Sequence, residues 1–276
     1  MVGKFYNKIL QYPFYILLIF STLFAFSIYQ SKNFELDASA DTLLIDNDPD
    51  LIYLRELNKR YKSEEFFIIT YTPNSPNKKE TIKELKKLVT EINNFKWISK
   101  TVSIINAPLL QSTNEPLMDR IKNLKYITNE NINTDKAIKE LSTSPVYKNL
   151  IISEDSKTFG IVAFIKDNKP YLETIDTKSK LLLSKKINKQ DLELINQKFK
   201  KLQKQHSKNI SKYNASIKKL IGNYQSNAEI RLSGIPMIAD DMMTFIKNDI
   251  VTFGIGVLLF IILTLWYVFR KIIWII

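Results

Sequence analysis

The chain has 276 residues, with 40 lysines and arginines against 28 aspartates and glutamates, no cysteine, and one histidine, His206. Without cysteine the chain cannot form a disulfide framework, a thiolate metal site or a cysteine nucleophile, and one histidine cannot build a histidine cluster or relay. The net charge of +12 is spread over most of the chain without an arginine-rich patch, so we do not expect nucleic-acid binding. These features disfavour an enzyme, and we expect no catalytic residue, metal or cofactor.

The first apolar segment is Phe14–Tyr29, which has lysines on both sides. An α-helix of about 16–18 residues just crosses a hydrocarbon core of about 30 Å. The pattern therefore predicts a cytoplasmic N-terminus and a membrane helix within residues 1–31. A cleavable signal peptide, with small residues near Ala25 and Ser27, is the alternative interpretation.

A second apolar segment, Ile250–Phe269, contains no charged residue and is followed by Arg270, Lys271 and a further apolar stretch. The positive-inside rule places these basic residues, like those at the N-terminus, in the cytoplasm, and the intervening chain outside. Neither segment contains an ionisable residue, so no proton-coupling site is expected here. The predicted organisation is 1–31 (N-terminus and first membrane helix), 32–248 (periplasmic domain), 249–270 (second membrane helix) and 271–276 (start of a third).

The chain between the two apolar segments alternates between helical and strand patterns. The order β-α-β followed by β-α-β fits a ferredoxin-like, split βαβ unit. The expected fold is therefore an α+β membrane protein: a ferredoxin-like periplasmic domain with a long helical insertion, between two membrane helices. The expected helices are 49–61, 78–93, 134–141, 191–224 and 237–248, and the expected strands are 66–71, 97–105, 158–165 and 228–232.

The helix expected at 191–224 is long for a small domain, because 34 residues would extend about 50 Å. Its apolar residues step by threes and fours in a seam typical of a coiled coil, and His206 lies in that seam. Two interpretations remain open. The helix packs against the neighbouring 181–187 region as a hairpin, or it contacts a partner subunit or another periplasmic protein.

Four residues mark the expected junction between the domain and the second membrane helix: Gly234, Pro236, Asp240 and Asp241. Two adjacent acids just before an apolar helix suggest cation binding or a conformational latch at this junction. The alternative is that the acids complement the dipole at the N-terminus of a helix.

Several spaced motifs carry a family resemblance. They are Asp-Ala-Ser-Ala-Asp-Thr-Leu-Leu at 37–44, Asn-Asp-Pro-Asp-Leu at 47–51, Ser-Pro-Val-Tyr at 144–147, Gly-Ile-Pro-Met-Ile-Ala-Asp-Asp-Met at 234–242 and Phe-Arg at 269–270. Taken together, and covering nearly the whole chain, they resemble the resistance-nodulation-division (RND) superfamily, most closely the exporter branch related to MMPL and hopanoid transporters.

This resemblance implies the N-terminal part of a proton-driven exporter of hydrophobic or lipid-like compounds in the bacterial inner membrane. The implied partners are the lipid bilayer, the remaining spans of the same transporter or its oligomeric partners, and the substrate. The family's coupling carboxylates lie in later spans, so none can be carried over to this chain, and no substrate-binding residue can be assigned. The end of the chain inside an apolar run leads us to expect a truncated or split gene.

Two other classes share the plan of a span, an outer domain and a second span. One is the ectodomain of a two-span membrane sensor, and the other is a scaffold that regulates polysaccharide chain length. Both predict a polar segment after the second span, whereas Ile272–Ile276 is apolar. The sequence therefore favours the exporter.

Overall fold

A computed structural model describes residues 12–31, 49–61, 64–111, 116, 122–183 and 188–270. The predicted start of a third span at 271–276 lies outside the described residues, as do the 37–44 motif and the first residues of the 47–51 motif. The chain divides into two compact units, 1–37 and 38–276, which are described separately.

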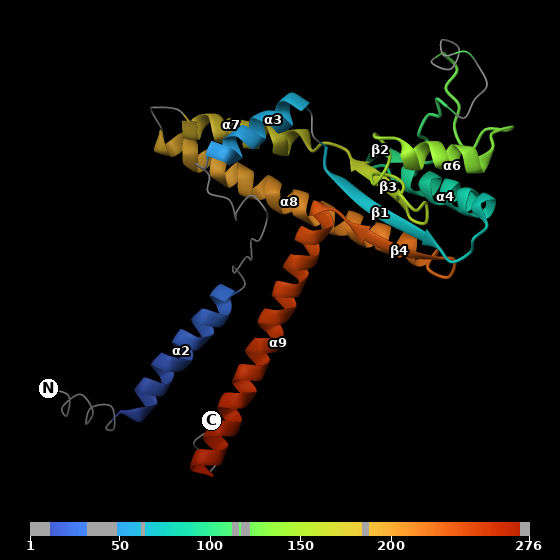
Figure 1. Cartoon of the computed structure of the whole chain (residues 1–276). Coiled ribbons are helices and arrows are strands. Elements are labelled where there is room, and N and C mark those ends of the chain that lie inside the picture. The colour runs from blue at the N-terminus through green and yellow to red at the C-terminus, as the bar shows by residue number, and fades with distance from the viewer. Residues whose placement is uncertain are drawn as a thin grey trace. The chain divides into compact units, whose positions relative to one another are not determined.

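The first unit contains helix α2, Pro13–Ser31 (Figure 1). The hydroxyls of Thr22 and Ser27 donate hydrogen bonds to backbone carbonyls one turn earlier, Leu18 and Leu23. These two hydroxyls are thus satisfied within the helix, as an apolar environment requires. Its apolar stretch, Phe14–Gln30, is shorter than the one in the second unit.

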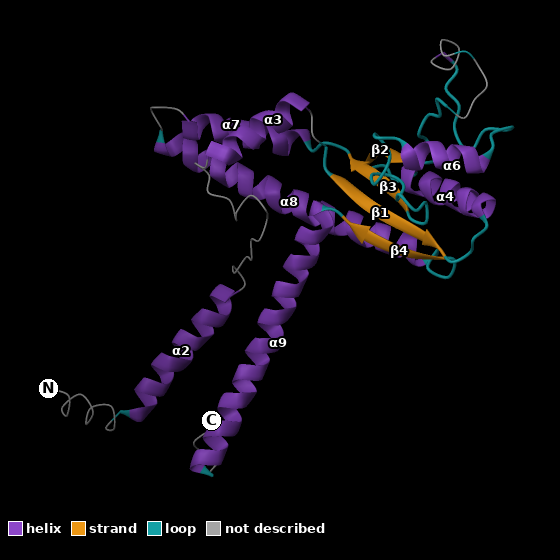
Figure 2. Cartoon of the chain, in the orientation of Figure 1, coloured by secondary structure: helices purple, strands orange, loops and turns teal. Residues whose placement is uncertain are grey.

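The second unit is built on a four-stranded antiparallel sheet with the order β2-β3-β1-β4 (Figure 2). Helix α4 links β1 to β2, and helices α7 and α8 link β3 to β4. The two βαβ units are therefore interleaved: β3 lies between β1 and β2, and β1 lies between β3 and β4. This confirms the mixed α+β class, and the strands form one antiparallel sheet. The strands are β1 Phe66–Pro73, β2 Ile98–Ser103, β3 Phe159–Ile165 and β4 Ala228–Ser233.

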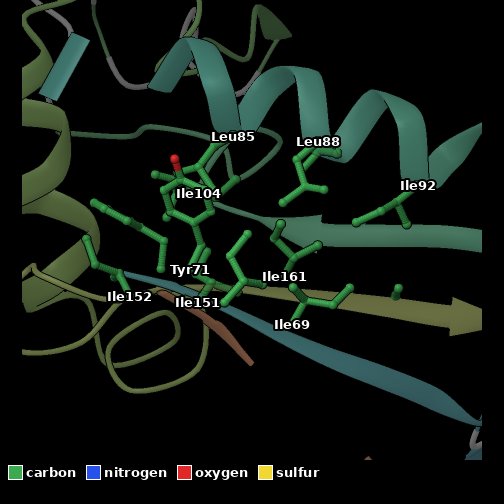
Figure 3. Packing of buried hydrophobic residues seen from close by; sticks show 14 of the residues in the cluster. Ile69, Tyr71, Leu85, Leu88, Ile92, Ile104, Ile151, Ile152 and Ile161 are labelled. Atoms are coloured by element: carbon green, nitrogen blue, oxygen red, sulfur yellow. The ribbon is translucent and has the colours of Figure 1, made fainter. Parts of the chain in front are cut away.

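Helix α4, Lys78–Asn93, covers one face of the sheet (Figure 3). Asn77 caps it by accepting a hydrogen bond from the Glu80 amide, which is why the predicted start was correct. Leu85, Leu88 and Ile92 project from one side of α4 and are almost completely buried. Each such side chain contributes roughly 1.5–3 kcal/mol on leaving water. Opposite them, every second residue of β1 is buried: Phe67, Ile69 and Tyr71.

The remaining helices of the domain agree with the predicted pattern in most places. Helix α3 is Pro49–Tyr61, as predicted, and α6, Thr134–Thr143, extends slightly beyond 134–141. Helix α7, Lys169–Leu183, was missed, apart from the start of the 181–187 region.

Helices α7 and α8 form a hairpin, and α8 is Lys189–Gly222. On α7, Tyr171 stacks on Phe199 of α8 with a centroid separation of 5.8 Å, and on His206 at 4.7 Å. This supports the hairpin interpretation for the first half of α8. The second half instead joins the domain core, where Ile210, Ile217 and Ile221 are buried.

The last helix, α9, runs without interruption over the 35 residues from Ile235 to Phe269. The helix predicted at 237–248 continues without a break into the apolar segment predicted as the second membrane helix, 249–270. Among the described residues, α9 is the one helix with the length and composition needed to cross a membrane, and its apolar segment is not buried in the chain.

Candidate functional site

Gly234 joins β4 to α9 in a conformation that other residues rarely adopt. Its φ is +124°, and a Cβ at this position would lie 2.7 Å from the carbonyl oxygen of Phe66 in β1. Glycine tolerates positive φ and has no Cβ to clash. The chain can therefore turn directly from the sheet into α9 only because glycine occupies position 234.

Pro236 follows in the first turn of α9 and is buried. A helix leaves its first amide N–H groups without intrahelical partners, so proline loses nothing there and fixes a helical φ. The next residue, Met237, packs against the hydrophobic core. The start of α9 is thus held against the sheet by a glycine turn and two apolar side chains.

One turn further on, two adjacent carboxylates of α9 meet a buried amide of α8. The side-chain nitrogen of Asn214 lies 2.6 Å from Asp240 Oδ2 and 3.2 Å from Asp241 Oδ1. Asn214 is only 2% exposed. Because ionised carboxylates only accept hydrogen bonds, the amide nitrogen must be the atom that faces them.

Lys218, one turn after Asn214 on α8, completes this cluster with an ion pair to Asp241 at 2.6 Å. Both side chains are partly exposed, and such pairs contribute about 0–1 kcal/mol. A hydrogen bond from a buried amide to a charged group is worth about 1.5–3 kcal/mol. Asn214 is therefore the main attachment, and we call Asn214, Lys218, Asp240 and Asp241 the junction cluster.

The seam position of Asn214 is costly for an asparagine. Its Oδ1 is buried and has no hydrogen-bond partner among the described residues, a loss of about 1–3 kcal/mol. An apolar side chain between Ile210 and Ile217 would avoid this cost. What asparagine adds at this position is the contact with α9.

Of the four predicted junction residues, Gly234 and Pro236 form the turn into α9, whereas Asp240 and Asp241 contact two residues of α8 that the sequence reasoning missed. Asn214 and Lys218 were not singled out, although Asn214 could have been found as the polar residue at a buried seam position, four after Ile210 and three before Ile217. The first turn of α9 holds no acidic residue. Asp240 and Asp241 thus lie beyond the turn where a dipole interaction acts, and side chains are their partners.

Cation binding receives no support at the junction. Within the parts of the chain that the structure describes, no group of three or more histidine, cysteine, aspartate or glutamate side chains is placed to hold a metal ion. Asp241 accepts a hydrogen bond from the Lys218 ammonium. The contacts that the structure shows for these two acids are with Asn214 and Lys218 of α8.

His206 occupies the seam, as expected. It stacks on Tyr171, and its Nε2 lies 3.2 Å from a carboxylate oxygen of Glu65, just before β1. These contacts tie the α7–α8 hairpin to the start of the sheet.

Comparisons with known proteins add no identification: a scan against protein-family models, a search of curated proteins and a search of solved structures each returned no match to this chain. The motif resemblance to RND exporters therefore stays a prediction.

Proposed function

We propose that this chain is the N-terminal portion of an RND-type exporter of hydrophobic or lipid-like compounds, driven by the proton gradient through spans that this sequence does not contain. The observation that supports the proposal best is the direct continuity between the α+β domain and α9. The sheet passes through Gly234 into a single helix that carries the apolar segment. A domain that handles substrate and a membrane part that uses the gradient need such a connection.

The apolar part of α9 also has the surface of a helix that packs against other membrane helices. Apart from the neighbouring backbone of α9 itself, no described atom lies within 4 Å of a Cβ placed at Gly254 or Gly256. Small residues let the backbones of two membrane helices approach closely. The two glycines are therefore proposed contact points for the remaining spans or for an oligomeric partner.

In this proposal the domain between α2 and α9 is periplasmic and the N-terminus is cytoplasmic. The absence of cysteine allows a direct test. A single cysteine replacing Lys79, which is exposed on α4, reacts in intact cells with a maleimide that cannot cross membranes. Protection of this cysteine until the cells are permeabilised would contradict the periplasmic placement.

The transport role is tested in two steps. The gene is first sequenced past the codon for Ile276; further spans and a second large outer domain support the exporter, whereas a stop codon with no adjacent membrane gene favours a scaffold or sensor. The complete gene is then deleted, and retention of a lipophilic fluorescent dye is measured with and without a protonophore. We expect deletion to raise retention only when the gradient is intact. Equal retention in both strains would contradict an export role for this class of compound.

A further inference from the structure

Most of helix α8 carries charged side chains of one sign, which is positive. Between Ile195 and Gly222 it contains eight lysines and no aspartate or glutamate, since its acidic residues, Asp191 and Glu193, both lie in the first two turns. Two of the eight interact within the chain: Lys218 is paired with Asp241 in the junction cluster, and Lys204 also has a partner. A helix face of this kind attracts an anionic partner.

Three of these lysines follow one line along the helix. Lys201, Lys204 and Lys208 are spaced by three and four residues, so at 3.6 residues per turn they lie within about 60° of one another. All three are exposed. We call these three residues the basic face.

The basic face points away from the hairpin partner of α8. Phe199 and His206 contact Tyr171 of α7. At about 100° per residue, the three lysines lie about 140–180° around the helix from these two aromatic residues. In Figure 1, α7 lies along one side of α8, whereas α9 leaves on the other side. The basic face is therefore on the side toward which the apolar segment of α9 extends.

The distance from α8 to the headgroup layer, measured along α9, matches the length of a lysine side chain. Helix α8 crosses α9 at Asp241, and the apolar run begins at Ile250, nine residues and about 14 Å further along. The headgroup layer outside the hydrocarbon core is about 5–7 Å thick, which leaves roughly 7–9 Å to the axis of α8. An extended lysine side chain reaches roughly 8 Å from a helix axis.

We propose that Lys201, Lys204 and Lys208 bind the anionic phospholipid headgroups of the membrane that α9 enters, and so hold α8 parallel to its surface. This inference rests on one part of the proposed function, which is the insertion of α9 into the membrane. Each lysine near an anionic membrane surface raises the ratio of surface-bound to unbound α8 by roughly fivefold. Replacing all three by glutamine is therefore expected to lower that balance by roughly a hundredfold.

The test uses the full chain in lipid nanodiscs. Gln197 is exposed on the same side of α8 as the basic face. It is replaced by cysteine, and this cysteine is labelled with a fluorophore. Because the chain has no cysteine of its own, the fluorophore attaches at this one position. The discs contain phosphatidylcholine alone or with phosphatidylglycerol, plus a trace of lipid with a nitroxide on its headgroup. Quenching of the fluorophore reports contact between α8 and the headgroups.

We expect stronger quenching in discs with phosphatidylglycerol, and loss of the difference near 1 M salt, where the Debye length falls to about 3 Å. The variant K201Q/K204Q/K208Q is expected to show no effect of phosphatidylglycerol. The control K79Q/K83Q/K86Q removes three exposed lysines of α4 and is expected to behave like the wild type. Far-UV circular dichroism verifies that both variants keep their helices.

Equal quenching in both lipids, or an unchanged response of the K201Q/K204Q/K208Q variant, would overturn the proposal. A response to soluble polyphosphate but not to phosphatidylglycerol would also overturn it. Alkaline carbonate extraction separates this failure from failure of the membrane anchor. A chain released by carbonate contradicts the anchor, whereas a chain that stays inserted but ignores phosphatidylglycerol contradicts only the basic face.

Discussion

The side-chain nitrogen of Asn214 on α8 lies 2.6 Å from a carboxylate oxygen of Asp240 on α9. Between the two residues the chain completes α8, forms strand β4 and turns at Gly234. The hydrogen bond therefore closes a loop around the edge strand of the sheet. It fixes the start of α9 against α8, in addition to the packing of Pro236 and Met237 on the core.

The first prediction concerns the strength of this attachment. In a double-mutant cycle, Asn214→Ala and Asp240→Ala are expected to show a coupling of about 1.5–3 kcal/mol in the free energy of unfolding, because a buried amide bonds a charged group. Urea denaturation in detergent measures it. Ser207→Ala, an exposed change on the same helix, is the control and should be additive with Asp240→Ala. Additivity in both cycles would show that the junction cluster contributes no coupling.

The second prediction concerns the turn into α9. Gly234→Ala forces a Cβ into the Phe66 carbonyl at a φ of +124°, so we expect a loss of at least about 2 kcal/mol in unfolding free energy. The matched control is Gly222→Ala at the end of α8, where no atom lies within 4 Å of the Cβ position. That change is expected to be neutral or stabilising by up to about 1 kcal/mol. Equal effects of the two substitutions would contradict the role assigned to Gly234.

The third prediction concerns alkaline stability. Burial, followed by the hydrogen bond to Glu84, raises the pKa of the Tyr71 hydroxyl above its ordinary value. Because an unfolded tyrosine ionises near pH 10, this residue stabilises the fold below that pH, and its contribution falls as the pH rises further.

Tyr71→Phe is therefore expected to cost about 1 kcal/mol at neutral pH through the lost hydrogen bond, and the gap to the wild type should narrow above about pH 10. Urea denaturation between pH 7 and about pH 11 measures both effects. A gap that stays constant over this range would show that Tyr71 ionises as readily in the folded chain as in the unfolded one.

The fourth prediction concerns the seam between α8 and the residues before β2. The rings of Trp97 and Tyr213 are parallel within 9°, with centroids 4.3 Å apart. Tyr213→Leu keeps an apolar side chain but removes the stacking, so we expect a loss of about 0.5–1.5 kcal/mol and a change in tryptophan fluorescence. Tyr53→Leu alters an exposed tyrosine of α3 and should change neither quantity.

Local signals in the sequence predicted most of the domain correctly. Helix α4 could be placed from its apolar stripe, and the strands differ from the predicted ranges by a few residues at most. Helix α7 was missed because its apolar residues form no long seam of their own. Lys247 and Asp249 change the polarity of α9 just before Ile250 but do not end the helix, because neither residue opposes a helical backbone.

The candidate site was predictable only in part. Gly234, Pro236, Asp240 and Asp241 form a compact motif, so the sequence could mark the junction. Their partners Asn214 and Lys218 lie on another helix, separated by a strand, and tertiary packing alone determines which turn of α8 meets α9. A polar residue in a buried seam indicates that a partner exists but does not identify it.

Because α9 is continuous, a rotation at its start moves its whole length as a rigid rod. About 28 residues lie between Asp241 and Phe269, so the attachment at the junction cluster is roughly 40 Å from the far end of the helix. A rotation of the domain by about 10° about this attachment would displace the far end of α9 by about 7 Å, which is comparable to the spacing between packed helices. A small movement of the sheet could thus change which neighbours the lower part of α9 contacts, without any hinge within the helix.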